Sequence, residues 1–190
     1  DRRQRQMCIR DRNSKQVWGK SQTLDIPEDG VVIDIFTIDF PQNITQVHFI
    51  KLRLFDTKGK EVANTFYWRS NDKYEGRKTL TGPTSSGFED LSKLKQVQLK
   101  TRYQTYQEGD RHFIKAEIKN PSSTVAFFTQ LQLLGQDKKP VRPSFYTDNF
   151  FSLLPGESKT VIIETAASDM PSEPTFVVKG WNIKPSSFKL

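Results

Sequence analysis

The feature that most constrains this chain is the alternation of apolar and polar residues with a period of two, in short runs separated by turn residues. The run RHFIKAEIKNPS at 111–122 shows it clearly, because Ile114, Ala116 and Ile118 alternate with charged residues. Such alternation is typical of a strand with one buried face, since successive side chains point to opposite faces of a sheet. No long stretch has the period of 3.6 residues that an amphipathic helix needs. The sequence therefore predicts an all-β protein.

The alternating runs fall into two blocks. In the first block, the turn TKG at 57–59 joins two of the runs, and Gly59 can take the positive φ that such a turn requires. One short helical turn is expected at 88–94, after a polar stretch rich in Gly, Ser and Pro. The block is too short for a complete sandwich, so we interpret 13–94 as a partial β-sandwich domain. Its predicted strands are 31–40, 46–56 and 61–70.

The second block, 95–190, has about the length of an immunoglobulin-like domain. Its strands are expected near 97–103, within 111–119 and 124–134, at 159–165 and within 175–183. Pro155-Gly156 should form a turn before the fourth of them. Phe127 should be buried between two sheets, on the same face as Val125 and Leu131. The predicted architecture is two immunoglobulin-like β-sandwich domains in tandem, the first of them N-terminally truncated.

The opening segment RRQRQMCIRDR at 2–12 does not fit this pattern. It holds five arginines and the chain's single cysteine, Cys8, and with Asp1 and Asp11 it contributes +3 to the formal net charge of +7. A basic arm for nucleic acid and a targeting peptide are two interpretations. The third, which we prefer, is that the eleven residues resemble the in-frame translation of a sequencing adapter. We therefore set 1–12 aside as a non-native segment, expected to be disordered, and expect the natural protein to extend further toward its N-terminus.

Charge and composition exclude several classes of partner and of structure. Beyond residue 12 the basic residues are scattered among acids and form no stripe that would follow phosphates, so no nucleic-acid partner is expected. No apolar run approaches the roughly 18 residues of a membrane span, so none is expected. Without Cys8 there is no disulfide framework. The localisation stays open, with a secreted or periplasmic place preferred to a cytoplasmic one.

Residues that could carry chemistry are few. His48 and His112 lie far apart in predicted strands, and we interpret both as structural rather than as metal ligands. The sequence holds no phosphate-binding glycine loop, nucleophile elbow or zinc-protease motif. Asn43 begins an Asn-Ile-Thr glycosylation sequon, whose use stays open. We therefore assign no catalytic, cofactor-binding or metal-binding residue.

Two aromatic runs need separate interpretation. In FYW at 66–68, Phe66 and Trp68 share one face of a strand while Tyr67 points to the other, which favours packing over a flat sugar-binding platform. The run SFYTDNFFSLLPGES at 144–158 is expected to wrap the sandwich core, with Asp148 or Asn149 capping a turn through bonds to backbone N–H groups. Direct contact with a ligand is the alternative for this run.

The same residues carry a resemblance. RPSFYTDNFFSLLPGESKTV, preceded by TVAFFTQLQLL and followed by VKGWN, resembles the C-terminal immunoglobulin-like domain of glycoside hydrolase family 2 enzymes. The branch it resembles holds the exo-β-D-glucosaminidases and the mannosylglycoprotein endo-β-mannosidases. FIKLRLFDTKGKEVANTFYW and DLSKLKQVQL resemble the end of the preceding sandwich and its connection, so the resemblance extends over about 31–184.

The resemblance implies a parent glycosidase whose chemistry lies on a (β/α)₈ barrel that this chain lacks. Such enzymes retain anomeric configuration with two glutamates about 5–5.5 Å apart. Neither glutamate maps onto Glu89 or Glu157. The chain is then an accessory part that packs against the barrel, stabilises it and is inactive alone, while the parent acts on β-glucosaminides or β-mannosides. An adhesion or carbohydrate-binding module of stacked sandwiches is the alternative, and a nucleic-acid binder the third.

Overall fold

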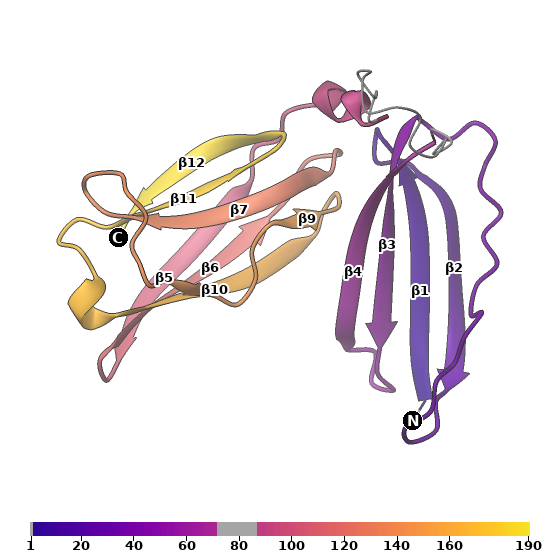
Figure 1. The fold of residues 1–190 in the computed structure, drawn as a ribbon, viewed down its shortest axis with the longest axis horizontal. Helices are drawn as coiled ribbons and strands as arrows, with labels where there is room; N and C mark the ends of the chain where they lie inside the picture. The colour runs from indigo at the N-terminus through magenta and orange to yellow at the C-terminus, as the bar shows by residue number, and fades with distance from the viewer. Residues whose placement is uncertain (1, 72–86) are drawn as a thin grey trace, which may run out of the picture. The chain divides into compact units, whose positions relative to one another are not determined.

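A computed structural model of the chain describes residues 2–71 and 87–190, and divides it into two compact units, Asp1–Leu94 and Lys95–Leu190 (Figure 1). The described residues form twelve strands in three four-stranded sheets, with two short 3₁₀ helices, η1 (Glu89–Lys93) and η2 (Ala167–Asp169). Every pairing between the strands β1 to β12 named below is antiparallel. The predicted all-β class is confirmed. The second unit begins at Lys95, where sequence analysis places the second domain.

Unit 1 contains one sheet in the order β2-β1-β3-β4. The turn between β3 and β4 has Gly59 at a φ of 76°, as expected from the TKG sequence. The 88–94 segment forms the predicted short helical turn as η1. The strands are β1 (Arg2–Asp11), β2 (Gln16–Asp25), β3 (Val47–Phe55) and β4 (Glu61–Ser70).

The expectation that 1–12 is disordered is wrong for this structure. Residues Arg2–Asp11 form β1, which lies between β2 and β3 and pairs with both. The physical reason is that Met7 and Ile9 lie two residues apart and so share one face, where both are buried beside Ile50 of β3. Met7 and Ile9 thus give this arginine-rich segment the apolar face that its composition conceals. The origin of the segment stays a prediction.

The run 31–40 is also different from its prediction. It is irregular rather than a strand, and Asp34 has a φ of 55°, which interrupts extended backbone. Its apolar residues still contribute to the core, because Phe36 and Ile38 pack against the cluster of Met7, Ile9 and Ile50. The alternation in 31–40 therefore indicates that one side of this segment contacts the sheet. It does not show that the segment pairs with a strand.

Unit 2 is a sandwich of two sheets, β5-β6-β10-β8 and β12-β11-β7-β9 (Figure 1). Ile114, Ala116 and Ile118 of β6 are buried while the residues between them are exposed, as their alternation predicts. Immunoglobulin-like sandwich architecture is thus confirmed here. The strands are β5 (Lys100–Glu108), β6 (Arg111–Lys119), β7 (Ala126–Leu134), β8 (Phe145–Tyr146), β9 (Phe151–Leu153), β10 (Ser158–Ala166), β11 (Thr175–Gly180) and β12 (Ile183–Lys189).

Two details of unit 2 correct the sequence analysis. The first strand begins at Lys100 rather than near residue 97, because Val97 makes a bridge with Ile183 at the start of β12 in the other sheet. Phe127 is buried as expected, but the cluster between the sheets contains Ala126 together with Leu131. The cause is Phe128, whose φ of 58° interrupts the alternation and reverses which residues face inward before it.

Candidate interaction surface

The two histidines do not form a site. His48 lies in β3 of unit 1 and His112 in β6 of unit 2. His48 is buried, and its ring contacts Phe40 edge-to-face, with 5.9 Å between ring centroids. Burial lowers the pKa of His48 below its ordinary value of 6.5, and the positive charge of Arg69 lowers it further. Within the described ranges, no three His, Cys, Asp or Glu side chains group as metal ligands would.

The acids weighed as glutamate candidates have structural roles or are exposed. Glu157 Oε2 accepts the backbone N–H of Leu154 at 2.8 Å, across the turn that holds Gly156 at a φ of 82°. Glu89 is exposed at the start of η1. Its neighbour Asp90 pairs with Lys93 and Arg12, and these bonds and charges lower the pKa of Asp90. These three acids thus show no pair of carboxyl groups across a cleft.

The aromatic run at 66–68 divides between two faces, as predicted. Phe66 stacks on Phe49 of β3 with 5.6 Å between ring centroids, and Trp68 is the cross-strand partner of Phe49 on the same face. Tyr67 is instead paired with Ile50, on the face that holds the Met7 cluster. A platform of three rings is therefore absent from this run.

The run 144–158 caps and anchors the sandwich. Asp148 Oδ1 accepts the backbone N–H of Asn149 at 2.7 Å, and Asn149 Oδ1 accepts that of Phe150 at 3.1 Å, which confirms the predicted caps. Asn149 also reaches β7, where its amide accepts from Leu131 N at 2.8 Å and donates to Leu131 O at 2.9 Å. Tyr146 Oη accepts the N–H of Leu133 at 2.9 Å. The run is therefore fixed to the backbone of β7.

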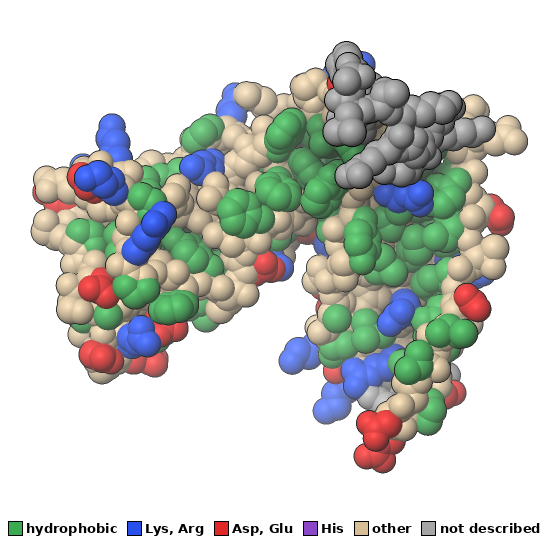
Figure 2. Space-filling model, in the orientation of Figure 1, with side chains coloured by type: hydrophobic (Ala, Val, Ile, Leu, Met, Phe, Trp, Pro, Cys, Tyr) green, Lys and Arg blue, Asp and Glu red, His purple; other side chains and the backbone are tan. Residues whose placement is uncertain are grey.

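Three large aromatic side chains are exposed at one end of unit 2, and we call Phe128, Phe150 and Trp181 the aromatic surface. Their exposed fractions are 37%, 50% and 60%. The rings of Phe128 and Phe150 are 5.6 Å apart and inclined at 50°. Trp181 is joined to the same place because its backbone N–H donates to the carbonyl of Phe127 at 3.0 Å. Figure 2 shows hydrophobic side chains gathered where β7 begins.

The backbone under the aromatic surface is unusual and well supported. Phe128 and Phe150 have φ values of 58° and 57°, in the left-handed region that bulky residues rarely adopt. The N–H of Phe128 is held by Ser152 Oγ at 3.2 Å. Next to Trp181, the buried Asn182 side chain accepts from Phe127 N and donates to the carbonyls of Val125 and Lys95, each at 2.8 Å. The surrounding hydrogen bonds therefore hold the backbone at Phe128 and beside Trp181.

The sequence did not lead us to predict that these three residues form a surface. For Phe128 and Phe150 a signal was present in the sequence. The chain contains two Phe-Phe pairs, 127–128 and 150–151. Neighbouring side chains of extended backbone point in opposite directions, so one ring of each pair is directed away from the core. In the structure Phe127 and Phe151 are buried while Phe128 and Phe150 are exposed.

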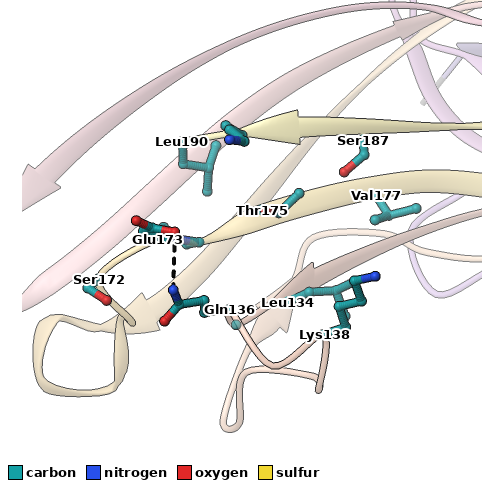
Figure 3. A pocket seen from close by; sticks show the side chains of 12 residues that line it. Leu134, Gln136, Lys138, Ser172, Glu173, Thr175, Val177, Ser187 and Leu190 are labelled. Atoms are coloured by element: carbon teal, nitrogen blue, oxygen red, sulfur yellow. Dashed lines mark hydrogen bonds between the residues drawn. The ribbon is translucent and has the colours of Figure 1, made fainter.

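A separate hollow of about 480 Å³ lies where β7, β11 and β12 meet the turns beside them (Figure 3). Gln136 Nε2 donates to Glu173 Oε2 at 3.4 Å across it. Val177 and Leu190 supply apolar lining, and Glu173 is the acidic residue of the lining. Two-carboxylate glycoside hydrolysis uses a pair of carboxyl side chains, and Glu173 is the one acidic side chain of this lining.

Unit 2 is thus an immunoglobulin-like β-sandwich in which the run 144–158 is bonded to the backbone of its own strand β7. Residues 79–183, more than half of the chain, match the exo-β-D-glucosaminidase Ig-fold domain family. The chain belongs to this family, which confirms the family resemblance found in the sequence. In the described residues, no helix is long and apolar enough to cross a membrane.

Curated relatives agree with this assignment. The chain is 30% identical over 179 residues to an exo-β-D-glucosaminidase of Streptomyces avermitilis, covering 88% of this chain and 20% of the relative. It is 27% identical over 157 residues to the Amycolatopsis orientalis exo-β-D-glucosaminidase, covering 77% of this chain and 15% of the relative. The chain thus spans a fifth or less of the length of these relatives.

Solved structures show the same fold. The crystal structure of the Amycolatopsis orientalis exo-chitosanase matches with a TM-score of 0.85 at 22% identity, over 99% of this chain and 23% of that chain. The same enzyme's exo-β-D-glucosaminidase structure, from a study of its inhibition by a glucosamine-configured castanospermine, matches with a TM-score of 0.84, also at 22% identity and with the same coverage.

Proposed function

We propose that this chain is the C-terminal accessory part of a retaining exo-β-D-glucosaminidase, whose catalytic barrel lies elsewhere in a longer protein. The observation that carries the proposal is the match to the exo-β-D-glucosaminidase Ig-fold domain family over more than half of the chain. The relatives, several times longer than the aligned region, supply further support. A glycosidase of the β-mannoside-cleaving branch is the neighbouring possibility.

In this proposal the chain packs against the barrel and stabilises it without taking part in the chemistry. Retaining hydrolysis needs a carboxylate nucleophile and an acid/base carboxyl held across a sugar-sized cleft, with the pKa of one carboxyl raised. Here Glu157 accepts a backbone N–H, Asp148 is paired with Lys159, and the pKa of Asp90 is lowered rather than raised. The two catalytic glutamates therefore belong to the part of the protein outside this chain.

The test compares the 190-residue chain with the longer gene product on p-nitrophenyl β-D-glucosaminide and p-nitrophenyl β-D-mannoside. We expect no turnover by the chain and turnover of at least one substrate by the longer product, with the β-anomer as first product by NMR. Turnover by the chain that disappears when one of its own acids is replaced would contradict the proposal. A longer product that consists of further sandwich repeats and cleaves neither substrate would contradict it too.

A carbohydrate-binding module is the second candidate, because exposed aromatic rings often stack on sugars and three of them gather on the aromatic surface. Titration of the chain with oligomers of glucosamine, followed by tryptophan fluorescence, separates the two candidates. Saturable quenching that is lost in Trp181→Ala would favour the module. Unchanged fluorescence at millimolar sugar would favour the accessory role.

A further inference from the structure

We propose that the hollow on the outer face of the sheet β12-β11-β7-β9 is a binding site for a neutral sugar of one or two pyranose rings. The inference goes beyond the proposed function, because it depends only on the lining of the hollow and gives unit 2 a ligand of its own. The hollow lies within unit 2, between the ends of β7, β11 and β12 and the segments 135–138 and 172–174 (Figure 3).

The floor of the hollow interrupts the alternation of its strands. Phe176 and Val178 of β11 are buried in the core, so Thr175 and Val177 lie on the opposite, outer face of the sheet. Cross-strand pairing places Leu134 of β7 beside Thr175 on this outer face. Leu134 and Val177 are therefore apolar side chains on a face that usually carries polar ones, and both are only partly buried. Such an apolar floor suits the C–H face of a sugar ring.

Polar groups surround this apolar floor. Ser172, Thr175 and Ser187 contribute hydroxyl groups to the lining, and Gln136 contributes an amide. The bond from Gln136 Nε2 to Glu173 Oε2 is 3.4 Å long and therefore weak, so both side chains keep the capacity to bond a ligand. A sugar needs several such partners, because each of its hydroxyls both donates and accepts a hydrogen bond.

The charges of the lining favour a neutral sugar over a charged one. Glu173 lies at one end of the hollow, and Lys138 lies beside Val177 nearer the other end (Figure 3). Lys189 adds a second positive charge to the lining. A cationic sugar is attracted by Glu173 but repelled by both lysines, and for an anionic sugar the signs are reversed. A hydroxyl can donate to the carboxylate and accept from an ammonium group, so a neutral sugar can use both.

The walls of the hollow are fixed by bonds within the chain. In the turn after β7, the N–H of Gly135 donates to Lys139 O at 2.9 Å, and Asp137 Oδ1 accepts the N–H of Lys139 at 3.0 Å. On another side, the N–H of Leu190 donates to Pro174 O at 3.1 Å. Preformed walls reduce the conformational entropy lost on binding. The volume of about 480 Å³ lies within the range of about 300–1,000 Å³ that is usual for small-molecule sites.

The test is an NMR titration of the isotope-labelled 190-residue chain with three disaccharides. Cellobiose is neutral, the β-1,4-linked glucosamine dimer is cationic in its ammonium form, and the galacturonic acid dimer is anionic. Cellobiose and the glucosamine dimer have the same ring skeleton and linkage and differ in the group at C2. Their comparison therefore isolates the effect of a positive charge on the ligand.

We expect cellobiose to cause saturable shifts of the backbone amide signals of Thr175, Val177 and Ser187, with a dissociation constant on the order of 1 mM, as a half-open site implies. Each charged disaccharide should bind at least about fivefold more weakly, because each meets a like charge in the lining. Absence of saturable shifts at these amides would overturn the inference. Tighter binding of either charged disaccharide would overturn it too and would assign the hollow to an ion.

Two variants locate the site. Glu173→Gln removes the carboxylate, and Val177→Thr places a hydroxyl in the apolar floor while keeping a residue that favours strands. Each should weaken cellobiose binding at least about threefold. Glu108→Gln is the matched control for the first variant, because Glu108 is an exposed glutamate of β5 outside the lining, and it should leave the affinity unchanged. A well-dispersed amide spectrum establishes that each variant is folded.

Unchanged affinity in both Glu173→Gln and Val177→Thr would contradict the assignment to this hollow. Cellobiose shifts confined to Phe150 and Trp181 would contradict it as well, and would place the sugar on the aromatic surface. Because the titration does not depend on turnover, binding by the chain when the longer product has no glycosidase activity would reject the proposed function and keep the site. Absence of binding would reject the site and leave the proposed function in place.

Discussion

The two units bury their apolar residues in different ways. Unit 2 encloses its core between two sheets, with Ile114, Ile163, Leu133 and Phe176 all buried in one cluster. In the described part of unit 1, the cluster of Met7, Ile9 and Ile50 on one face of a single sheet is covered by the irregular segment that carries Phe36 and Ile38.

The difference shows what a second sheet adds. In unit 2, paired strands hold both sides of the core, and buried asparagines bond backbone groups that the strands leave unpaired: Asn120 donates to Leu153 O at 2.9 Å and Asn182 to Val125 O at 2.8 Å. The covering segment of unit 1 has no strand pairing over 31–40. We therefore expect unit 1 to be the less stable and the more dependent on single elements.

Deleting residues 2–12 should have the largest effect. It removes the strand between β2 and β3 together with buried Ile9 and Met7, so we expect the melting transition of unit 1 to disappear while that of unit 2 remains. Calorimetry of the chain with and without the segment measures this. Two unchanged transitions would show that β1 is dispensable and would support the interpretation of the segment as non-native.

Replacing one phenylalanine in each unit tests the contrast in packing. Phe176 is buried and contacts Tyr103 of the opposite sheet, with 5.1 Å between ring centroids, and Phe188 at 4.8 Å. Phe176→Ala should lower the free energy of unfolding of unit 2 by about 3–5 kcal/mol. Phe36, half-buried in the irregular segment beside Trp18, should cost unit 1 only about 1–2 kcal/mol when changed to Ala.

Urea denaturation with a separate probe for each unit gives both values. Phe145→Ala, at an exposed position, is the control and should change neither unit by more than about 0.5 kcal/mol. A larger loss from Phe36→Ala than from Phe176→Ala would reverse the comparison.

The smallest expected effect is a pH dependence confined to unit 1. Burial and Arg69 hold the pKa of His48 below 6.5, so between its folded and unfolded pKa values the unfolded state binds more protons. The stability of unit 1 should therefore be complete above about pH 6.5 and decrease as the pH falls below it. Melting at pH 7.5, 6.5 and 5.5 measures the decrease.

The control pair for this pH dependence is His48→Gln and His112→Gln. The first should remove the decrease in unit 1, and the second should leave it unchanged. A decrease that persists in His48→Gln would assign the effect to another group.

Part of the architecture could be predicted from local sequence because its signals are local. The alternation of Ile114, Ala116 and Ile118 indicates a half-buried strand wherever it is placed, and the β3–β4 turn depends on a glycine at a φ of 76°. The same reasoning predicted correctly that Phe66 and Trp68 share a face and that Asp148 and Asn149 cap the turn before β9.

The candidate surface could be predicted only in part. The two Phe-Phe pairs require that some rings point outward, but which ring of each pair does so depends on positive φ at Phe128 and Phe150. Those values are fixed by bonds from Ser152 and Asn149 to β7, across about twenty residues of sequence. The alternation of apolar and polar residues therefore does not predict which phenylalanine of each pair is exposed.

By itself, then, the sequence determined the all-β class, because strand periodicity and turn residues act over a few neighbours. It also contains the run 144–158, whose residues indicate the family. Only the tertiary structure decided that Arg2–Asp11 is a central strand, that 31–40 is not a strand, and that Ala126 joins Leu131 in the core cluster of unit 2. The physical reason is that pairing and register depend on partners distant in sequence: Met7 and Ile9 are ordinary residues of an arginine-rich segment until Ile50 lies beside them.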